Sequence, residues 1–201
     1  MSRPKSPEKK EWIRKAAIRI VSDEGFHKCT TDKIAEQAGV SVGTIYNYFQ
    51  DKEDILSYIF QVEHTKLNIY FDRIMKKEMT VPDKFKLLIG KYFKYAFNNK
   101  KLVKLIHDES NRPAKRVTQE MFSYMLAIRE HLKELLKEGV EEGSIYSEYD
   151  LDIIANILLG SANVTALFGH LKPEKIDYIS TEGPEILFNV LANGIFIISN
   201  K

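Results

Sequence analysis

Cysteine is almost absent from this sequence, and its scarcity restricts where the protein can act. The 201 residues include one cysteine, Cys29, so no intrachain disulfide can form. A chain of this kind suits a reducing compartment. Its first residues are polar and charged and lack the apolar core of a signal peptide. We therefore expect a cytoplasmic protein.

Long hydrophobic runs are also scarce. No window approaches the roughly 20 apolar residues that a membrane-spanning helix needs. The nearest window, residues 186–199, is shorter and is interrupted by Asn189 and Asn193. We interpret it as a buried helix and expect no membrane partner.

The spacing of histidine and acidic residues does not match a metal site or a catalytic centre. The five histidines are scattered, and the clusters at 107–109 and 130–134 lack the paired ligands of zinc and di-metal motifs. We find no glycine-rich phosphate loop and no nucleophile elbow. Cys29 lies beside a helix start but has no paired histidine, so we interpret it as a small buried residue. We expect no metal, no cofactor and no enzymatic activity.

Strand-type alternation is missing, whereas apolar residues recur at helical spacing through most of the chain. The one short strand candidate, residues 144–149, is interpreted as a loop. We therefore predict an all-α protein of roughly nine helices. The apolar stripes cover residues 13–21, 34–38, 41–49, 55–74, 82–96, 102–106, 113–143, 150–170 and 184–199.

A helix-turn-helix is predicted within residues 30–49. Thr30 or Thr31 can cap the first helix, Gly39 can supply the turn, and Ser41 can cap the second helix. Val40 and Ile45 then have the spacing of a hydrophobic staple. Two short helices joined by such a turn form a helix-turn-helix.

The second of these helices divides into two faces at 100° per residue. Ile45 and Phe49 point toward the first helix, while Gly43, Thr44 and Asn47 lie on the opposite side. Tyr46 and Tyr48 fall on the two flanks. A helix in a DNA major groove needs this division, because its central face meets base edges and its flanks meet phosphates. Lys52, just beyond the helix, can add a charge contact. A purely structural helix with half-buried tyrosines is the alternative.

The charge distribution gives only a weak indication. Residues 1–52 contain ten Lys or Arg and seven Asp or Glu, although the whole chain has a net charge of +2. The basic arm with Arg3, Lys5, Lys9 and Lys10 suits either a phosphate partner or simple solvation.

Residues 30–56, "TTDKIAEQAGVSVGTIYNYFQDKEDIL", closely resemble the DNA-binding segment of the TetR family of bacterial repressors. The marks are the threonine cap, "IA..AGVS", "GT.Y.YF" and "KEDIL", together with Ala16–Ala17 and Gly25–Phe26 upstream. Position 42 is Val42 here, whereas many members of the family have a polar residue there that contacts a phosphate. Val42 could instead contact a thymine methyl, so the operator sequence stays open. The resemblance implies DNA contacts from Thr31, Ser41, Gly43, Thr44, Tyr46, Asn47, Tyr48 and Lys52, with Val42 beside them.

The last two helices, at 150–170 and 184–199, are apolar on all sides and must be buried. A homodimer with a four-helix bundle across a two-fold axis explains this, and a palindromic DNA site also requires a dimer. A monomeric core is the alternative. The predicted interface residues are Ile157, Gly160, Val164, Phe168, Leu187, Leu191, Gly194 and Ile195.

The middle helices are rich in aromatic residues and methionine, which suits either a core or a pocket. The TetR resemblance implies a small hydrophobic effector that shifts the helix after the DNA-binding segment. "YF..KEDIL" and "HDESN" also resemble regulators of fatty-acid degradation that respond to acyl-CoA. Arg112, Lys115 and Arg116 could hold CoA phosphates or could be solvated. The expected ligand residues are Tyr92, Phe93, Met121, Phe122, Met125 and Asn163.

Two domains are therefore expected, a three-helix DNA-binding domain at 1–52 and a larger helical ligand-binding and dimerisation domain at 53–201. The leading hypothesis is a dimeric repressor released from its operator by the effector. The alternative is an architectural or nucleoid-associated protein that binds double-stranded DNA and recruits a protein partner without a small-molecule effector.

Overall fold

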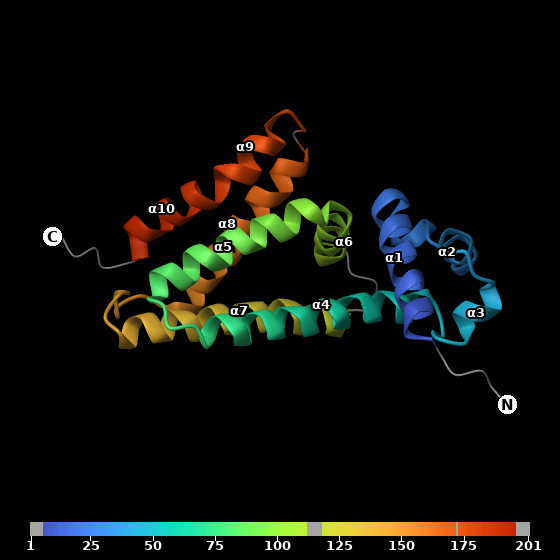
Figure 1. Ribbon diagram of the computed structural model, residues 1–201, viewed down its shortest axis with the longest axis horizontal. Helices are drawn as coiled ribbons and strands as arrows, with labels where there is room; N and C mark the ends of the chain where they lie inside the picture. The colour runs from blue at the N-terminus through green and yellow to red at the C-terminus, as the bar shows by residue number, and fades with distance from the viewer. Residues whose placement is uncertain (1–5, 112–117, 172, 196–201) are drawn as a thin grey trace. The chain divides into compact units, whose positions relative to one another are not determined.

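The computed structural model describes residues 6–111, 118–171 and 173–195, and their regular elements are all helical (Figure 1). This confirms the all-α prediction. Residues 144–149 form a loop in which Ile145 is buried. The elements are α1 (Pro7–Glu24), η1 (Phe26–Lys28), α2 (Thr31–Ala38), α3 (Val42–Tyr46), α4 (Lys52–Met75), α5 (Val81–Asn98), α6 (Lys100–Asn111), α7 (Thr118–Glu141), α8 (Leu151–Leu171), η2 (Pro173–Lys175), α9 (Ile176–Thr181) and α10 (Gly183–Ile195).

The chain forms two compact units. The amino-terminal unit contains residues 1–65 and 101–124, and the carboxy-terminal unit contains residues 66–100 and 125–201. The long helices α4 and α7 each run from one unit into the other. The sequence predicted a domain boundary at residue 52, directly after the helix-turn-helix. The compact unit that contains this motif is larger, because it also includes the first part of α4 and most of α6.

The core of the amino-terminal unit joins the helix-turn-helix to α1 and α4. Ile13 and Ile20 of α1, Ile34 of α2 and Ile45 of α3 lie in one buried cluster with the first part of α4. Side chains from α6 and α7 complete the cluster, namely Leu102, Leu105 and Met121. The helix-turn-helix therefore shares a core with residues that lie far beyond it in the sequence.

A buried ion pair crosses this core. The Arg14 guanidinium on α1 donates to Glu63 on α4 over 3.0 Å and also binds Glu11 in bidentate geometry, at 2.7 and 2.8 Å. The side chains of Arg14 and Glu63 are 7% and 3% exposed. Two charges taken out of water must keep their partners, so this pair fixes the contact between α1 and α4.

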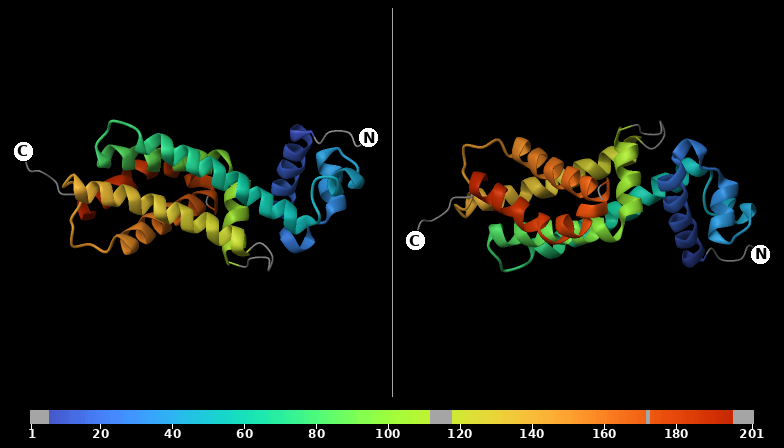
Figure 2. Two further views of the ribbon diagram at one scale, coloured as in Figure 1. Left: turned by 90° about the horizontal axis from the view of Figure 1, so that it is seen from below. Right: turned by 90° about the horizontal axis from the view of Figure 1, so that it is seen from above.

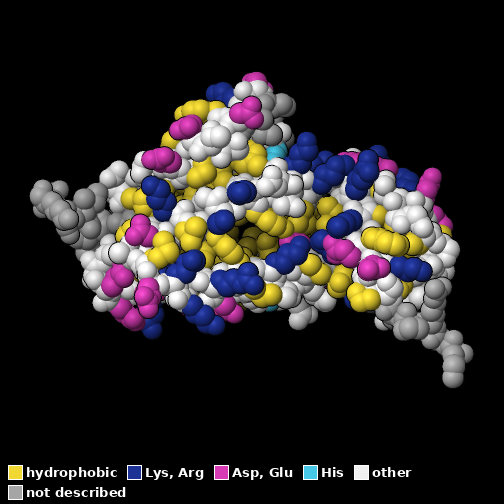
Figure 3. All heavy atoms as spheres, in the orientation of Figure 1, with side chains coloured by type: hydrophobic (Ala, Val, Ile, Leu, Met, Phe, Trp, Pro, Cys, Tyr) yellow, Lys and Arg dark blue, Asp and Glu magenta, His cyan; other side chains and the backbone are white. Residues whose placement is uncertain are grey.

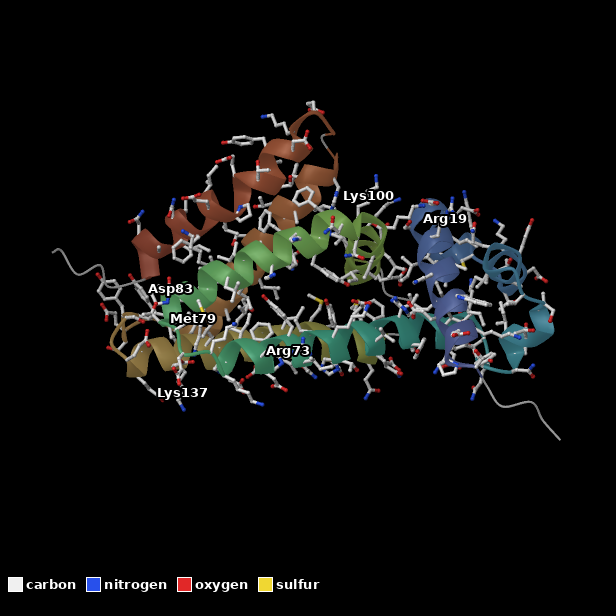
Figure 4. The ribbon with its side chains drawn as sticks, viewed as in Figure 1. Arg19, Arg73, Met79, Asp83, Lys100 and Lys137 are labelled. Atoms are coloured by element: carbon white, nitrogen blue, oxygen red, sulfur yellow. The ribbon has the colours of Figure 1, made fainter. Side chains whose placement is uncertain are left out.

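The carboxy-terminal unit has its own core, built from the second parts of α4 and α7 with α5 and α8. Figure 2 shows α5, α8 and α10, which contact one another. Gly139 of α7 is required there, because a Cβ at this position would lie 2.6 Å from Ile145 and 2.9 Å from Val81. The outer faces of α4 and α7 are polar, and Arg73 and Lys137 point into solvent (Figure 4).

Helix α8 corrects the expectation about hydrophobic runs. By length and composition, Leu151–His170 is long and apolar enough to cross a membrane, and only 17% of the qualifying window is buried within the chain. The window at 186–199 was therefore the wrong one to single out. A helix that lies exposed on an isolated chain but is buried in an oligomer has the same composition, so this feature alone does not indicate a membrane.

Candidate nucleic-acid interface

Local capping builds the helix-turn-helix as the sequence predicted. The Thr30 hydroxyl accepts from the Lys33 amide at 3.3 Å, which identifies Thr30 as the cap of α2. Gly39 ends α2 in the left-handed conformation at φ 66° and ψ 35°. The Ser41 hydroxyl then accepts from the Thr44 amide at 3.1 Å and caps α3. These bonds satisfy backbone donors at the helix starts and fix the turn between the helices.

The recognition helix is shorter than expected but keeps its two faces. Regular helix ends at Tyr46, and Asn47 stays helical at φ −70° and ψ −23° before a turn. The Phe49 amide still bonds to Ile45 over 2.9 Å. Ile45 and Phe49 are 0% and 3% exposed, which confirms their predicted inward orientation.

The outward side of α3 presents small and polar groups. Ser41, Gly43 and Asn47 are exposed, while Thr44 and Val42 are half-buried. A Cβ at Gly43 would meet only the Ser41 hydroxyl, at 3.9 Å, so the α3 backbone is open to close approach. The hydroxyls of Ser41 and Thr44 lie 2.9 Å apart. Val42 packs its side chain against the core of the unit.

Each flanking tyrosine is tied to the start of another helix. The Tyr46 side chain is 57% exposed, and its hydroxyl lies 3.4 Å from that of Thr31 at the start of α2. The Tyr48 oxygen accepts from the Ser6 amide at 2.7 Å, just before α1. Tyr48 therefore acts as a hydrogen-bond acceptor toward the backbone before α1. The structure thus brings Thr31 and Tyr46 together and ties Tyr48 to the residue before α1.

Lys52 has a structural role that sequence reasoning missed. Its ammonium donates to the backbone carbonyls of Phe26 and Cys29, each at 3.1 Å, and lies 4.5 Å from the centre of the Phe26 ring. An ammonium group has three hydrogens, so two carbonyl bonds leave one for a phosphate. Lys52 therefore ties α4 to the segment before α2, and any phosphate contact is additional.

Other basic residues near the motif also have partners within the protein. Lys33 contacts Glu24 and the Lys28 carbonyl, and Lys10 lies 3.8 Å from the centre of the Tyr58 ring. Arg3 and Lys5 of the predicted arm lie outside the described residues. The positive charge of this region is thus only partly available for DNA.

Cys29 is buried, as expected. Its side chain is 1% exposed, and burial raises the pKa of the thiol to about 11. A thiol with this pKa stays protonated at neutral pH and is a poor nucleophile.

The expected ligand residues divide between the two units. In the carboxy-terminal unit, the Tyr92 hydroxyl donates to the Asn163 amide oxygen over 2.5 Å, and burial raises the pKa of Tyr92. Phe93 is 0% exposed and Met125 is half-buried. Met121 and Phe122 belong to the amino-terminal unit, where Met121 is a core residue and Phe122 is 62% exposed. The structure therefore brings together Tyr92 and Asn163, and places Met121 in a separate core.

A pocket of about 260 Å³ lies between α4 and α7 within the amino-terminal unit. None of the predicted ligand residues is among its described lining residues, five of which have polar side chains. One Glu120 carboxylate oxygen is buried and has no hydrogen-bond partner. The lining residues are Phe60, Gln61, His64, Gln119, Glu120 and Ser123.

Helices α8 and α10 expose apolar stripes, and hydrophobic side chains reach the surface along α9 and α10 (Figure 3). On α8, Ile153, Ile157, Val164 and Phe168 are between 50% and 57% exposed, on the same face as Gly160. The spacing of these residues is that of one helix face.

The exposed side of α10 is shifted by one residue from the predicted interface. Ile186 and Val190 are 46% and 67% exposed, whereas Leu187 and Leu191 are half-buried. Gly194 is exposed, and the Ile195 side chain is outside the described part of the chain.

Among the described residues, no group of three or more His, Cys, Asp or Glu side chains could hold a metal ion.

Comparison with known proteins agrees with the capped helix-turn-helix. Residues 13–59 match the family model for bacterial regulatory proteins of the tetR family. The match covers the helix-turn-helix and its flanking helices, which are less than half of the chain. The whole chain is 26% identical over 180 residues to the fatty acid metabolism regulator protein of Bacillus subtilis strain 168, covering 90% of this chain and 92% of that one.

Solved structures of two fatty-acid regulators show the same fold. The fatty acid degradation regulator FadR from Bacillus halodurans superimposes with a TM-score of 0.85 and 26% identity, covering 96% of this chain and 98% of that one. FadR from Bacillus subtilis, solved in complex with stearoyl-CoA, superimposes with a TM-score of 0.83 and 26% identity, covering 92% and 98%. The likeness therefore extends through both units of this chain.

Proposed function

We propose that this protein is a homodimeric transcriptional repressor of the TetR family that binds a palindromic operator. The recognition face supports this most directly, because Gly43 and Asn47 are exposed between two tyrosines on a helix held by two caps. The open Gly43 backbone suits close approach to base edges, and the tyrosine hydroxyls suit the phosphates on either side. A protein that acts on DNA in this way works in the cytoplasm.

The exposed stripes of α8 and α10 support the homodimer. A monomeric soluble protein rarely exposes a contiguous apolar surface of this kind. Two copies that pair these stripes about a two-fold axis bury them in a four-helix bundle. The same symmetry gives two recognition helices, whose half-sites then lie one DNA turn or a multiple of it apart.

We propose that the effector of this repressor is a hydrophobic molecule, a long-chain acyl-CoA. The support is the likeness to the fatty-acid regulators, one of them solved with stearoyl-CoA. In the carboxy-terminal unit of this chain, the buried ring of Phe93 lies beside Tyr92, whose hydroxyl donates to Asn163. Occupation of that unit needs to favour one arrangement of the chain by only about 1–3 kcal/mol to release DNA.

Fluorescence anisotropy tests this function. The purified protein is first used to select operator fragments from the source genome, and the labelled fragment is then titrated with protein. We expect stearoyl-CoA to weaken binding about 5- to 150-fold, the range of typical allosteric coupling. Free CoA and stearate serve as controls for the two halves of the effector. Tight operator binding that no acyl-CoA changes would instead favour an architectural protein without an effector.

A further inference from the structure

The pocket between α4 and α7 has a chemistry that the proposed effector does not match. Among its described lining residues the one charged carboxylate is Glu120, and none is a lysine or arginine. The multiply charged phosphates of a CoA group are held best by cationic donors, and a carboxylate repels them. The described lining therefore suits a ligand of another class.

The buried oxygen of Glu120 indicates what that class is. A carboxylate is an acceptor only, and a buried acceptor without a partner is costly. A ligand with an ammonium or guanidinium group can donate to this oxygen and also neutralise its charge. Phe60 lines the same pocket and adds an aromatic ring, which attracts cations.

The remaining lining and the volume limit the size of the ligand. Gln61, Gln119 and Ser123 are neutral hydrogen-bonding groups that can orient a polar molecule. At about 30 Å³ for each water in the liquid, a pocket of about 260 Å³ holds roughly nine waters. A ligand of about that many non-hydrogen atoms fits.

We propose that this pocket binds a small organic cation through Glu120, as a site separate from that of the acyl effector. Binding here is expected to reach the DNA-binding helices, because Phe60, Gln61 and His64 share one turn of α4 with Glu63. That residue pairs with Arg14 of α1. A ligand that shifts this turn therefore acts on a buried contact within the same unit.

Isothermal titration calorimetry with n-butylguanidinium, an eight-atom cation, tests the site in the full-length protein. n-Butanol and butyrate are the neutral and anionic controls of matched chain length. We expect the cation to bind, butyrate not to bind, and Glu120→Gln to weaken cation binding about tenfold or more, since a charge-assisted hydrogen bond is lost. Glu130→Gln is the matched control, because Glu130 is exposed and lies further along α7, outside the pocket. This variant should bind the cation as the wild type does.

Three results would overturn the proposal. The first is absence of a heat signal from the cation, and the second is equal binding by Glu120→Gln. The third is displacement of the cation by stearoyl-CoA in direct competition, which would make the pocket part of the effector site. Operator binding is measured on the same preparations, so failure of the pocket is separable from failure of the proposed repressor function. If operator affinity is unchanged by saturating cation, the link through Glu63 and Arg14 is wrong.

Discussion

At the scale of single residues, Lys52 has an intramolecular role in addition to the DNA contact proposed for it. Its two carbonyl bonds are intramolecular, while its third hydrogen and its charge remain for a phosphate. The sequence predicted only the second role, because position 52 directly follows the motif. The first depends on carbonyls of Phe26 and Cys29, more than twenty positions away, which no local pattern indicates.

Replacing Lys52 with methionine should therefore change two measured quantities. The free energy of unfolding in urea should fall by about 1–3 kcal/mol, because hydrogen bonds from a charged donor are lost. The slope of log affinity for DNA against log salt should decrease by about 0.9, the value for one phosphate contact. Lys76→Met removes an exposed lysine from the other unit and should leave both quantities unchanged. A normal salt slope for Lys52→Met would show that Lys52 has only the structural role.

At the scale of helices, capping signals were predictable and long-range pairing was not. Thr30, Gly39 and Ser41 act on neighbours within a few residues, so the sequence located the ends of α2 and the start of α3. The pair of Arg14 and Glu63 spans 49 positions. The pocket between α4 and α7 likewise depends on the packing of distant segments. On α10, apolar residues occur on all sides, so periodicity could not show that Ile186 and Val190, rather than Leu187 and Leu191, face outward.

The ion pair between α1 and α4 gives a prediction at this scale. Arg14→Met removes the cation from the buried Glu63 carboxylate and should lower the free energy of unfolding by about 3–5 kcal/mol. Glu63→Leu should cost less, because Arg14 keeps its bidentate contact with Glu11. The double variant removes both charges and should recover most of the loss caused by Arg14→Met, because apolar side chains of similar volume can fill the site. Urea denaturation of all four proteins gives the coupling free energy. Equal instability of the double variant and Arg14→Met would mean that the cost comes from lost packing.

At the scale of the whole molecule, the proposed homodimer has the exposed faces of α8 and α10 as its interface. Gly160 lies on the exposed face of α8, and a Cβ there would meet no atom within 4 Å in the single chain. Gly160→Leu should therefore leave the protomer folded, while its bulk prevents two α8 helices from approaching closely. Sedimentation velocity should show a monomer for this variant and a dimer for the wild type.

Gly90 of α5 provides the matched control, since a Cβ there also meets no atom within 4 Å in the described structure. Gly90→Leu should remain a dimer. A dimeric Gly160→Leu protein would place the interface on another surface. A Gly160→Leu protein that unfolds would show that the glycine has a role within the protomer.

Hydroxyl-radical footprinting of the intact protein on its selected operator tests the central claim, that the outward side of α3 reads DNA. The wild-type protein should protect two half-sites whose centres lie one helical turn or a multiple of it apart. Asn47→Ala should lose the base-specific contacts of its exposed amide, weakening operator binding by about 1–3 kcal/mol while affecting non-specific DNA little. Equal footprints and affinities for Asn47→Ala and the wild type, or no protection at low salt, would contradict this account.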